Sequence, residues 1–342
     1  MPLGETMLAV VKVAAGVDGV ELRNIPVPHA ASGQIRMRVV ATGVCGTDLH
    51  IATDEYAYEA PVVMGHEICG VVDEVGSGVV GIAVGTAVVA ETYFSWCGVC
   101  DWCRAGRINL CPSRRSLGSF ENGGFAPYIV MPATNAHALP PSSLSTEGEP
   151  PAYFALAEPL ACVCQCLLDP AVVGAGDLVL VTGPGAMGQL SAQVAKACGG
   201  VVTLAGLEQD GERLAVAEGL GISVTTGVPE PDAFDVVIEC SGSAPGAATA
   251  LQSARRGARY VQVGIFGRPV TIPLDAMLYN ELRLTSGFAS TPASWRRAMT
   301  LIATGAVALQ PLVTSEVPIR NWREAFEAVQ QGSGIKTVIV PR

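Results

Sequence analysis

A glycine-rich turn placed between an apolar strand and a helix is the feature that most limits how this chain can fold. The turn, Gly183-Pro-Gly185-Ala-Met-Gly188, follows the apolar run Leu178 to Thr182 and leads into helical residues up to Ala197. Glycines allow the tight turn and close backbone approach that a pyrophosphate requires, and a helix N-terminus attracts its negative charge. Because a second apolar run, Val201 to Ala205, follows, the pattern predicts a dinucleotide-binding site that includes Ala186 and Met187.

The two halves of the chain differ in pattern. Beyond the glycine turn, apolar strands such as Val236 to Glu239 and Tyr260 to Val263 alternate with helical stretches such as Ala244 to Ala254. This alternation predicts a doubly wound parallel sheet, hence an α/β fold. The first 140 residues carry short alternating runs and many turns, which predict a β-rich domain. A length of 342 residues also exceeds what one core usually supports, so we expect two domains.

Composition and charge exclude several classes of function. A net charge of -10 argues against nucleic acid as a partner, because phosphate backbones are bound by basic surfaces. Apolar runs such as Val79 to Ala90 are interrupted by glycine, so no transmembrane helix and no membrane partner are expected. The N-terminus shows no basic and apolar leader, which favours the cytoplasm. In that reducing compartment, clustered cysteines more often bind metal than form disulfides.

Four cysteines within fifteen residues form a C-x2-C-x2-C-x7-C array: Cys97, Cys100, Cys103 and Cys111. Four thiolates complete the tetrahedral shell of a zinc ion and leave no position for substrate, so the array predicts a structural zinc site. Buried cysteines without metal would not cluster in this way. A zinc module that binds nucleic acid is disfavoured by the acidic charge.

A second, mixed set of possible metal ligands lies nearby in the sequence. Cys45-Gly-Thr47-Asp48-Leu-His50 is followed by Gly65-His66-Glu67, and Glu158 begins a Glu-Pro-Leu segment. Sulfur, nitrogen and oxygen donors of this kind hold a catalytic zinc while one position stays open. Neither segment is specific alone, since a lone cysteine usually packs in a core. Their combination with the four-cysteine array indicates a catalytic metal site.

The choice between NAD and NADP depends on the end of the second strand of the parallel sheet. Where an acidic residue normally binds the ribose hydroxyls, the chain has Gly206. The next acidic residues, Glu208 and Asp210, favour NAD, whereas Arg213 would suit the additional phosphate of NADP. We expect NAD, with NADP possible.

Taken together, these motifs closely resemble the zinc-containing medium-chain alcohol dehydrogenase family, in its sorbitol (L-iditol), butanediol and threonine dehydrogenase branch. The resemblance spans nearly the whole chain and includes the closing segment Gly334-Ile-Lys336-Thr-Val. It implies a β-rich, GroES-like catalytic domain from residues 1–152 and 291–342. It also implies an inserted Rossmann cofactor domain from residues 153–290. The branch is often tetrameric, so a homo-oligomer, tetramer or dimer, is expected.

The resemblance also assigns roles to individual residues. It implies that Cys45 and His66 bind the catalytic zinc with Glu67 as a further ligand, and that Glu158 stands where other alcohol dehydrogenases have a cysteine ligand. Thr47 and His50 would form a proton relay, against the alternative of a turn-capping hydroxyl and a surface histidine. The remaining implied residues would contact the nicotinamide half of the cofactor: Gly264, Ile265, Phe288 and Lys336.

The implied activity is zinc-dependent hydride transfer between NAD(H) and a secondary alcohol or its ketone. The segment Leu284 to Thr291 lacks the arginine that binds polyol hydroxyls in animal sorbitol dehydrogenases, so diols, amino alcohols, cyclitols and simple ketones stay open beside polyols. One alternative is a non-catalytic or regulatory dinucleotide-binding protein with a structural zinc only. A second is an NADP-dependent ketone reductase on the same fold. A zinc-independent enone reductase is disfavoured, because that branch lacks these ligands.

Overall fold

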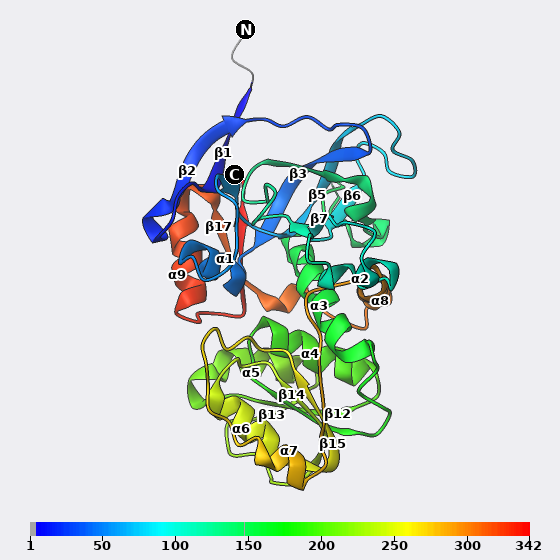
Figure 1. Cartoon of the computed structure of the whole chain (residues 1–342), viewed down its shortest axis with the longest axis vertical. Coiled ribbons are helices and arrows are strands. Elements are labelled where there is room, and N and C mark those ends of the chain that lie inside the picture. The colour runs from blue at the N-terminus through cyan, green and yellow to red at the C-terminus, as the bar shows by residue number, and fades with distance from the viewer. Residues whose placement is uncertain (1–4, 147) are drawn as a thin grey trace. The chain divides into compact units, whose positions relative to one another are not determined.

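The computed structural model describes residues 5–146 and 148–342, which form two compact units (Figure 1). Among the described residues, unit 1 comprises those up to Glu158 and those from Val313 to Arg342, and unit 2 comprises residues 159–312. Each unit has its own sheets and its own hydrophobic core.

Unit 1 is built mainly from strands. Those of its largest sheet are β3 (Gln34–Gly43), β5 (Glu67–Val75), β6 (Ala87–Ala90), β9 (Tyr128–Pro132), β10 (Ala136–Ala138), β17 (Val313–Pro318) and β18 (Lys336–Val340). Their order is β10-β6-β5-β3-β18-β17, with β9 also paired to β3. Along β3 every second side chain from Ile35 is buried, as expected for a strand with one face on the core. The C-terminal β18 pairs antiparallel with β3, so the tail of the chain belongs to this unit.

The other elements of unit 1 are shorter. Two small sheets have the orders β2-β1-β4 and β7-β8 and consist of β1 (Thr6–Lys12), β2 (Val20–Pro26), β4 (Val62–Val63), β7 (Tyr93–Ser95) and β8 (Arg115–Ser116). The α-helices within the unit are α1 (Gly46–Ala52), α2 (Asp101–Arg104) and α9 (Trp322–Gln330). Its 3-10 helices are η1 (Val17–Gly19), η2 (Ile108–Leu110), η3 (Ala133–Asn135), η4 (Pro141–Ser143), η5 (Ala152–Leu156) and η8 (Ile319–Asn321).

An apolar cluster fixes α1 within unit 1. Trp322 and Phe326 on α9 pack edge to face, with ring centroids 5.1 Å apart, in the same buried cluster as Ile51 of α1. Trp322, Phe326 and Val329 recur at helical spacing and give α9 one apolar face. Burying each such side chain stabilises the unit by about 1.5–3 kcal/mol. The helix that begins beside Cys45 is therefore held by the C-terminal part of the chain.

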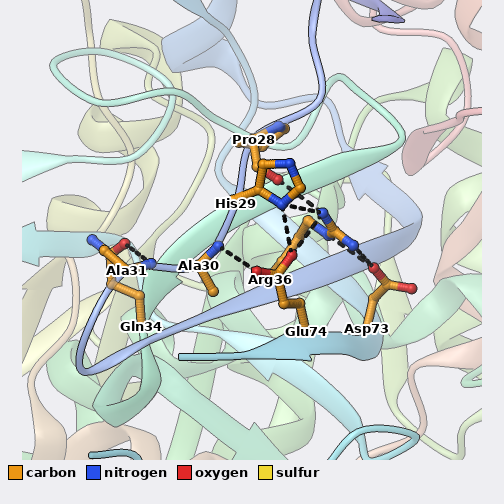
Figure 2. A network of polar contacts seen from close by, with 8 residues as sticks. All are labelled: Pro28, His29, Ala30, Ala31, Gln34, Arg36, Asp73 and Glu74. Carbon is orange, nitrogen blue, oxygen red and sulfur yellow. Dashed lines mark hydrogen bonds and ion pairs between the residues drawn. The ribbon is translucent and has the colours of Figure 1, made fainter. Parts of the chain in front are cut away.

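A polar network fixes the connection between β2 and β3 (Figure 2). Arg36 on β3 lies 2.8 Å from Asp73 through Nε and 2.8 Å from Glu74 through Nη1, and both carboxylates belong to β5. Nη1 of Arg36 also donates to the carbonyl of Pro28, and Glu74 accepts the N–H of Ala30. One guanidinium thus ties the loop to two neighbouring strands, as its planar fork of donors allows.

Unit 2 contains a parallel sheet, as the alternating pattern predicts. Its strands are β11 (Leu178–Thr182), β12 (Val201–Ala205), β13 (Ser223–Thr225), β14 (Phe234–Glu239), β15 (Ala254–Gln262) and β16 (Arg283–Ser286). Their order is β13-β12-β11-β14-β15-β16, and all pairs are parallel. The order reverses direction between β11 and β14, where ligands of such sheets bind beyond the carboxyl ends of the strands. The predicted mixed α/β architecture is confirmed.

The helices that accompany this sheet are α3 (Ala157–Leu168, which begins in unit 1), α4 (Ala186–Ala197), α5 (Gly211–Gly219), α6 (Ala244–Ser253), α7 (Asp275–Tyr279) and α8 (Pro292–Ala303). Two 3-10 helices, η6 (Glu208–Asp210) and η7 (Gln310–Leu312), complete the unit. In the part of the chain that the structure describes, no helix is long and apolar enough to cross a membrane.

The division into units differs from the predicted domain boundary after residue 290, because residues 291–312 pack with unit 2. Thr291, the N-cap of α8, donates to Gln165 of α3 at 2.7 Å, and Trp295 of α8 is fully buried. Ala308 donates its N–H to Gln193 of α4 at 2.7 Å. These buried contacts place α8 in unit 2, although the chain returns to unit 1 soon after it, at Val313.

Candidate metal and cofactor sites

The first candidate site begins at the N-terminus of α1, where a cysteine stands in the N-cap position. The carboxylate of Asp48 accepts the backbone N–H of Cys45 at 2.9 Å, which closes a capping box. The hydroxyl of Thr47 lies 3.7 Å from Cys45 Sγ. The sequence Cys-Gly-Thr-Asp therefore starts a helix and fixes the thiol at its end.

Three predicted ligands come together at this point. Donor atoms of Cys45, His66 and Glu67 all lie within 4.8 Å of one another. His66 and Glu67 are buried at the start of β5, after the left-handed turn at Gly65, where a Cβ would collide with Phe125. Donors this close can share one small cation, and sulfur, nitrogen and oxygen donors suit zinc.

His66 is oriented by a carboxylate that the prediction did not place in the metal site. Its Nδ1 lies 3.6 Å from Asp48 Oδ1, and Asp48 is fully buried. Burial lowers the pKa of His66, but the Asp48 carboxylate and the Cys45 thiol raise it, and the net pKa lies well above the usual value. A buried carboxylate behind a histidine is the arrangement that orients histidine ligands in metal sites.

Glu67 has a buried partner, Lys336, that the sequence pattern did not reveal. Lys336 Nζ lies 2.6 Å from Glu67 Oε1 and 2.5 Å from Oε2, and both side chains are buried. Burial raises the pKa of Glu67 overall, while Lys336 and His66 oppose that rise and Glu158 adds to it. For Lys336, burial lowers the pKa, but the charge of Glu67 outweighs it. Gly43 is required beside them, since a Cβ there would collide with Glu67.

Lys336 was expected to contact the cofactor. In unit 1 its ammonium contacts Glu67, a residue 269 positions earlier in the chain. The hint in the sequence is a lysine at the start of β18, whose last three residues are apolar.

Glu158 is held by a threonine from another part of unit 1. Thr92 Oγ1 donates to Glu158 Oε1 at 2.7 Å, and Glu158 is buried. Glu158 lies outside the group of three donors that fall within 4.8 Å of one another, although its charge contributes to the raised pKa of Glu67. It is therefore near the three candidate ligands but at a greater distance.

The two members of the expected proton relay have different partners. His50 Nδ1 lies 2.6 Å from Glu55 Oε2, and the side chain of His50 is about one-third exposed, at 35%. Thr47 contacts Cys45 rather than His50 among the hydrogen bonds of the described residues. Glu55 thus orients His50, and a relay through Thr47 stays a prediction.

The four-cysteine array forms a compact second candidate site. All four Sγ atoms lie within 4.8 Å of one another, with 3.9 Å between Cys97 and Cys103 and 3.6 Å between Cys97 and Cys111. Sulfur atoms about 2.3 Å from one ion at tetrahedral angles lie about 3.8 Å apart, so the cluster has the dimensions of a zinc site.

The thiols of this cluster interact strongly. Backbone N–H groups of Val99 and Cys100 lower the pKa of Cys97 to about 6. Burial, together with the neighbouring thiols, raises the pKa of Cys103 to about 12. Four thiols at this spacing cannot all ionise without a cation between them.

The glycine turn of unit 2 has the form that the sequence predicts. Gly183 has φ 90°, and a Cβ on it would lie 2.6 Å from Ser241 Cα. A Cβ on Gly188 would collide with the carbonyl of Gly183, whereas a Cβ on Gly185, the N-cap of α4, meets nothing within 4 Å. The backbone at Gly185 is thus open to a ligand at the positive end of a helix, whose first two residues are Ala186 and Met187.

Both predicted ribose contacts in the loop after β12 already have partners in unit 2. Asp210 accepts the N–H of Leu207 at 2.9 Å and pairs with Arg213 at 3.2 Å. Glu208 accepts the hydroxyl of Thr226 at 3.0 Å. Gly206 leaves the strand end without a carboxylate, and a Cβ at this position would lie 3.0 Å from Pro184.

The remaining predicted cofactor residues follow β15 and β16. The N–H of Gly264 donates to the carbonyl of Glu239 at 2.8 Å, while Ile265 and Phe288 expose 71% and 42% of their surface. Two cysteines on α3, Cys164 and Cys166, are neutral thiols packed in the interior. Burial raises the pKa of Cys164 to about 12 and that of Cys166 to about 11.

Comparisons with known proteins point to one family. The model of the alcohol dehydrogenase GroES-like domain matches residues 31–141, and that of zinc-binding dehydrogenases matches residues 186–304. The sorbitol dehydrogenase of Halalkalibacterium halodurans is 36% identical, over 98% of this chain and 99% of the relative. The D-arabitol-phosphate dehydrogenase of Enterococcus avium is 33% identical, over 98% of each chain. A zinc-binding dehydrogenase structure from Sinorhizobium meliloti, bound to NADP, is 32% identical with a TM-score of 0.87 and covers 98% of this chain and 100% of that one.

Proposed function

The chain belongs to the zinc-binding alcohol dehydrogenase family, and we propose that it transfers hydride between a secondary alcohol, or its ketone, and a nicotinamide dinucleotide. The observation that carries this proposal is the convergence of Cys45, His66 and Glu67, whose donor atoms lie within 4.8 Å of one another. These residues come from two separate segments of the chain. A structural role alone would not require a mixed set of donors there, two of which, His66 and Glu67, are buried.

The proposed catalytic zinc is held by Cys45, His66 and Glu67, with Glu158 as a further carboxylate that binds directly or through water. A zinc ion in such a site acts as a Lewis acid and lowers the pKa of an alcohol oxygen. Asp48 holds the His66 ring, and Lys336 holds Glu67, so the ligands are oriented before a metal binds. The four cysteines Cys97, Cys100, Cys103 and Cys111 are proposed to hold a second, structural zinc.

The chain's own residues would also move the alcohol proton. We assign Thr47 to accept the proton from the alcohol oxygen while its own hydroxyl proton passes on towards His50. The imidazole of His50 takes up a proton on one ring nitrogen and releases one to solvent. The exposed position of His50 and its contact with Glu55 support this role. The two side chains need a bridging group between them, such as water or a cofactor hydroxyl.

The dinucleotide is assigned to unit 2. Gly183, Gly185 and Gly188, with Ala186 and Met187, surround the open N-terminus of α4, which suits a pyrophosphate. The nicotinamide is proposed to contact three residues that follow β15 and β16: Gly264, Ile265 and Phe288. Lys336 is bonded to Glu67 instead, so we give it no direct contact with the nicotinamide.

NAD is the proposed cofactor, because Glu208 and Asp210 place two carboxylates in the loop after β12. A second candidate function, an NADP-dependent ketone reductase, is favoured by Gly206 and Arg213 and by the NADP bound to the related Sinorhizobium meliloti protein. Steady-state rates with both cofactors decide between them. A higher kcat/KM with NADP than with NAD would overturn the first choice.

We propose the substrate class from the names of the relatives. Sorbitol and D-arabitol phosphate are the substrates in the names of two of them, so polyols and their phosphates head the panel, followed by diols and amino alcohols. We expect oxidation of at least one with about two zinc ions bound per chain, by the ligand counts above. An enzyme that binds only the structural zinc and turns over no alcohol or ketone would instead be a non-catalytic or regulatory binding protein.

We further propose that the protein is a cytoplasmic homo-oligomer, a dimer or a tetramer. β16 is one of the two edge strands of the parallel sheet, and large apolar side chains near it are exposed: Leu278, Tyr279 and Leu284. Exposed strand edges with apolar neighbours are suited to pairing with another chain. Free cysteines throughout the chain suit a reducing compartment. Light scattering after size exclusion gives the oligomeric state, and a monomer at micromolar concentration would contradict it.

A further inference from the structure

A buried carboxylate that no prediction singled out joins two loops at the carboxyl edge of the parallel sheet. Glu239 is the last residue of β14 and is fully buried. Its Oε1 accepts the N–H of Ser241 at 2.8 Å and the Ser241 hydroxyl. The N–H of Gly242 lies 3.1 Å from Oε1 and 3.2 Å from Oε2. The side chain therefore binds the loop that directly follows its own strand.

The same residue binds the next loop along the sheet. Its backbone carbonyl accepts the N–H groups of Val263 and Gly264 at 2.9 and 2.8 Å. Its Oε2 accepts from Gln262 Nε2 at 2.8 Å, and this amide nitrogen also donates to the carbonyl of Gly264 at 2.7 Å. Tyr260 donates to Gln262 Oε1 at 2.8 Å, which fixes the orientation of the amide.

At three glycines the backbones of neighbouring loops lie so close together that no side chain would fit between them. A Cβ on Gly264 would lie 2.6 Å from Glu239 Oε2 and would collide with the backbone of Gly242. A Cβ on Gly242 would collide with the carbonyl of Ile265, and one on Gly183 would lie 2.6 Å from Ser241 Cα. The loops after β11, β14 and β15 are therefore in backbone contact on one edge of the sheet, with the Glu239 carboxylate between two of them.

We propose that Glu239 is a positioning residue that fixes residues 263–265 against residues 241–243 and so determines how the nicotinamide half of the dinucleotide binds. The inference rests on the proposed function, because it assumes that Gly264 and Ile265 face the nicotinamide. Glu239 itself does not touch the cofactor, since it has no exposed surface. The pyrophosphate turn at Gly183 is formed by its own glycines and needs no bond from Glu239.

The alternative is that Glu239 only stabilises unit 2. The two roles differ in which part of the cofactor is affected. A stabilising role predicts a lower melting temperature with unchanged affinity of the folded protein. A positioning role predicts weaker binding of the nicotinamide half with unchanged binding of the adenine half.

The test compares Glu239→Gln with a matched variant at the opposite end of the same strand. In Glu239→Gln, the new NH2 group faces a hydrogen-bond donor of Ser241, Gly242 or Gln262. Two donors cannot bond to each other, so the contact with that loop is lost. In Asp235→Asn, the carboxylate that accepts the N–H of Leu178 at 2.8 Å and pairs with Arg255 is replaced at the amino end of β14, away from the candidate site. Calorimetry on the zinc-loaded full chain measures the Kd of NADH, or NADPH if it binds more tightly, and the Kd of ADP.

For Glu239→Gln we expect the Kd of NADH to rise about tenfold or more, as for loss of hydrogen bonds to a charged group, while the Kd of ADP changes less than about twofold. Asp235→Asn should lower the melting temperature and leave both Kd values unchanged. An unchanged Kd of NADH in Glu239→Gln, or equal weakening of NADH and ADP, would overturn the inference.

A second variant decides the question if Glu239→Gln does not fold. Gln262→Leu removes the bonds to Glu239 Oε2 and to the Gly264 carbonyl, together with the bond from Tyr260, and leaves the Glu239 carboxylate in place. The same selective weakening of NADH binding is expected. Unchanged binding of NADH by that variant overturns the inference in that case. A wild-type protein that binds neither NADH nor NADPH would overturn the proposed function itself, and this inference with it.

Discussion

The two groups of metal-binding candidates in unit 1 are built in opposite ways. The four-cysteine cluster comes from one stretch, Cys97 to Cys111, and its thiols have mainly one another as neighbours. The mixed group takes Cys45 from the start of α1 and His66 and Glu67 from β5, and Asp48 and Lys336 stand behind them. The first is local and depends on a cation for its charge balance. The second is assembled by the fold and carries a compensating cation of its own.

This difference separates two uses of a metal. Thiolates that only a cation can hold together will separate when the ion is removed, so the loop around them depends on it. Ligands held by other side chains keep their positions without the ion, and their open coordination position is available for chemistry. We therefore expect damage to the first group to affect folding more than catalysis, and damage to the second to do the reverse.

The largest effect is expected when a ligand of the mixed group is replaced. Cys45→Ser should lower kcat by about a thousandfold or more, since Lewis-acid stabilisation contributes several kcal/mol to such reactions. Zinc content should fall from about two ions per chain to about one, while the circular dichroism spectrum stays that of the wild type. An enzyme that keeps its full rate would contradict the catalytic assignment.

The second effect concerns Lys336, whose ammonium group balances the charge of Glu67 in the mixed group. Lys336→Met leaves Glu67 buried without its partner and should lower the free energy of unfolding by about 3 kcal/mol or more. Urea denaturation measures the loss. The double variant Lys336→Met/Glu67→Gln removes the uncompensated charge and should recover most of the stability, although not activity. If the double variant is as unstable as the single one, the ion pair is not the cause.

The third effect tests the opposite expectation for the four-cysteine cluster. Cys97→Ser should weaken zinc binding there and lower the free energy of unfolding by about 2 kcal/mol, within the range for lost metal or disulfide links. The loop from residue 97 to 111 should become sensitive to protease, and kcat of the remaining folded protein should fall far less than in Cys45→Ser. Cys198→Ser, which replaces a cysteine outside both groups, serves as the control. A larger loss of kcat than of stability in Cys97→Ser would reverse the comparison.

The same contrast explains how much the sequence alone could predict. The four cysteines and the glycine turn are short-range patterns, so their geometry follows from spacing, and the mixed α/β fold is confirmed. Pairs such as Glu67 with Lys336 and Glu158 with Thr92 join residues far apart in the chain, and nothing local marks them. Residues 291–312 pack with unit 2 through the contact of α8 with α3, a tertiary effect that no local pattern marks. From the sequence, Glu239 is only the last residue of a strand. Its bonds reach two loops that come together only in the folded sheet, so no local pattern predicts them.

The smallest effect comes from a second buried lysine, which supports the mixed group from the far end of α1. Lys12 is fully buried, and its Nζ donates to the carbonyl of Ala52 at the end of the helix and lies 2.9 Å from Asp54. Hydrogen bonds from Tyr58, Lys12 and the N–H of Gly16 lower the pKa of Asp54 from 3.8 to about 2. Because the folded pKa is the lower one, the contribution of Asp54 to stability is complete above about pH 4 and is lost as the pH falls towards 2.

Asp54→Asn should therefore melt below the wild type by a constant margin at pH 7 and pH 5, and the margin should narrow at pH 3. Asp18→Asn, which replaces an exposed carboxylate in the preceding turn, should show no such margin. Differential scanning calorimetry at the three pH values gives the comparison. A margin that is the same at pH 3 as at pH 7 would mean that the Asp54 charge does not support the helix. In that case the far end of α1 would be held by the bond from Lys12 to the Ala52 carbonyl and by the apolar cluster around Ile51, without help from the Asp54 charge.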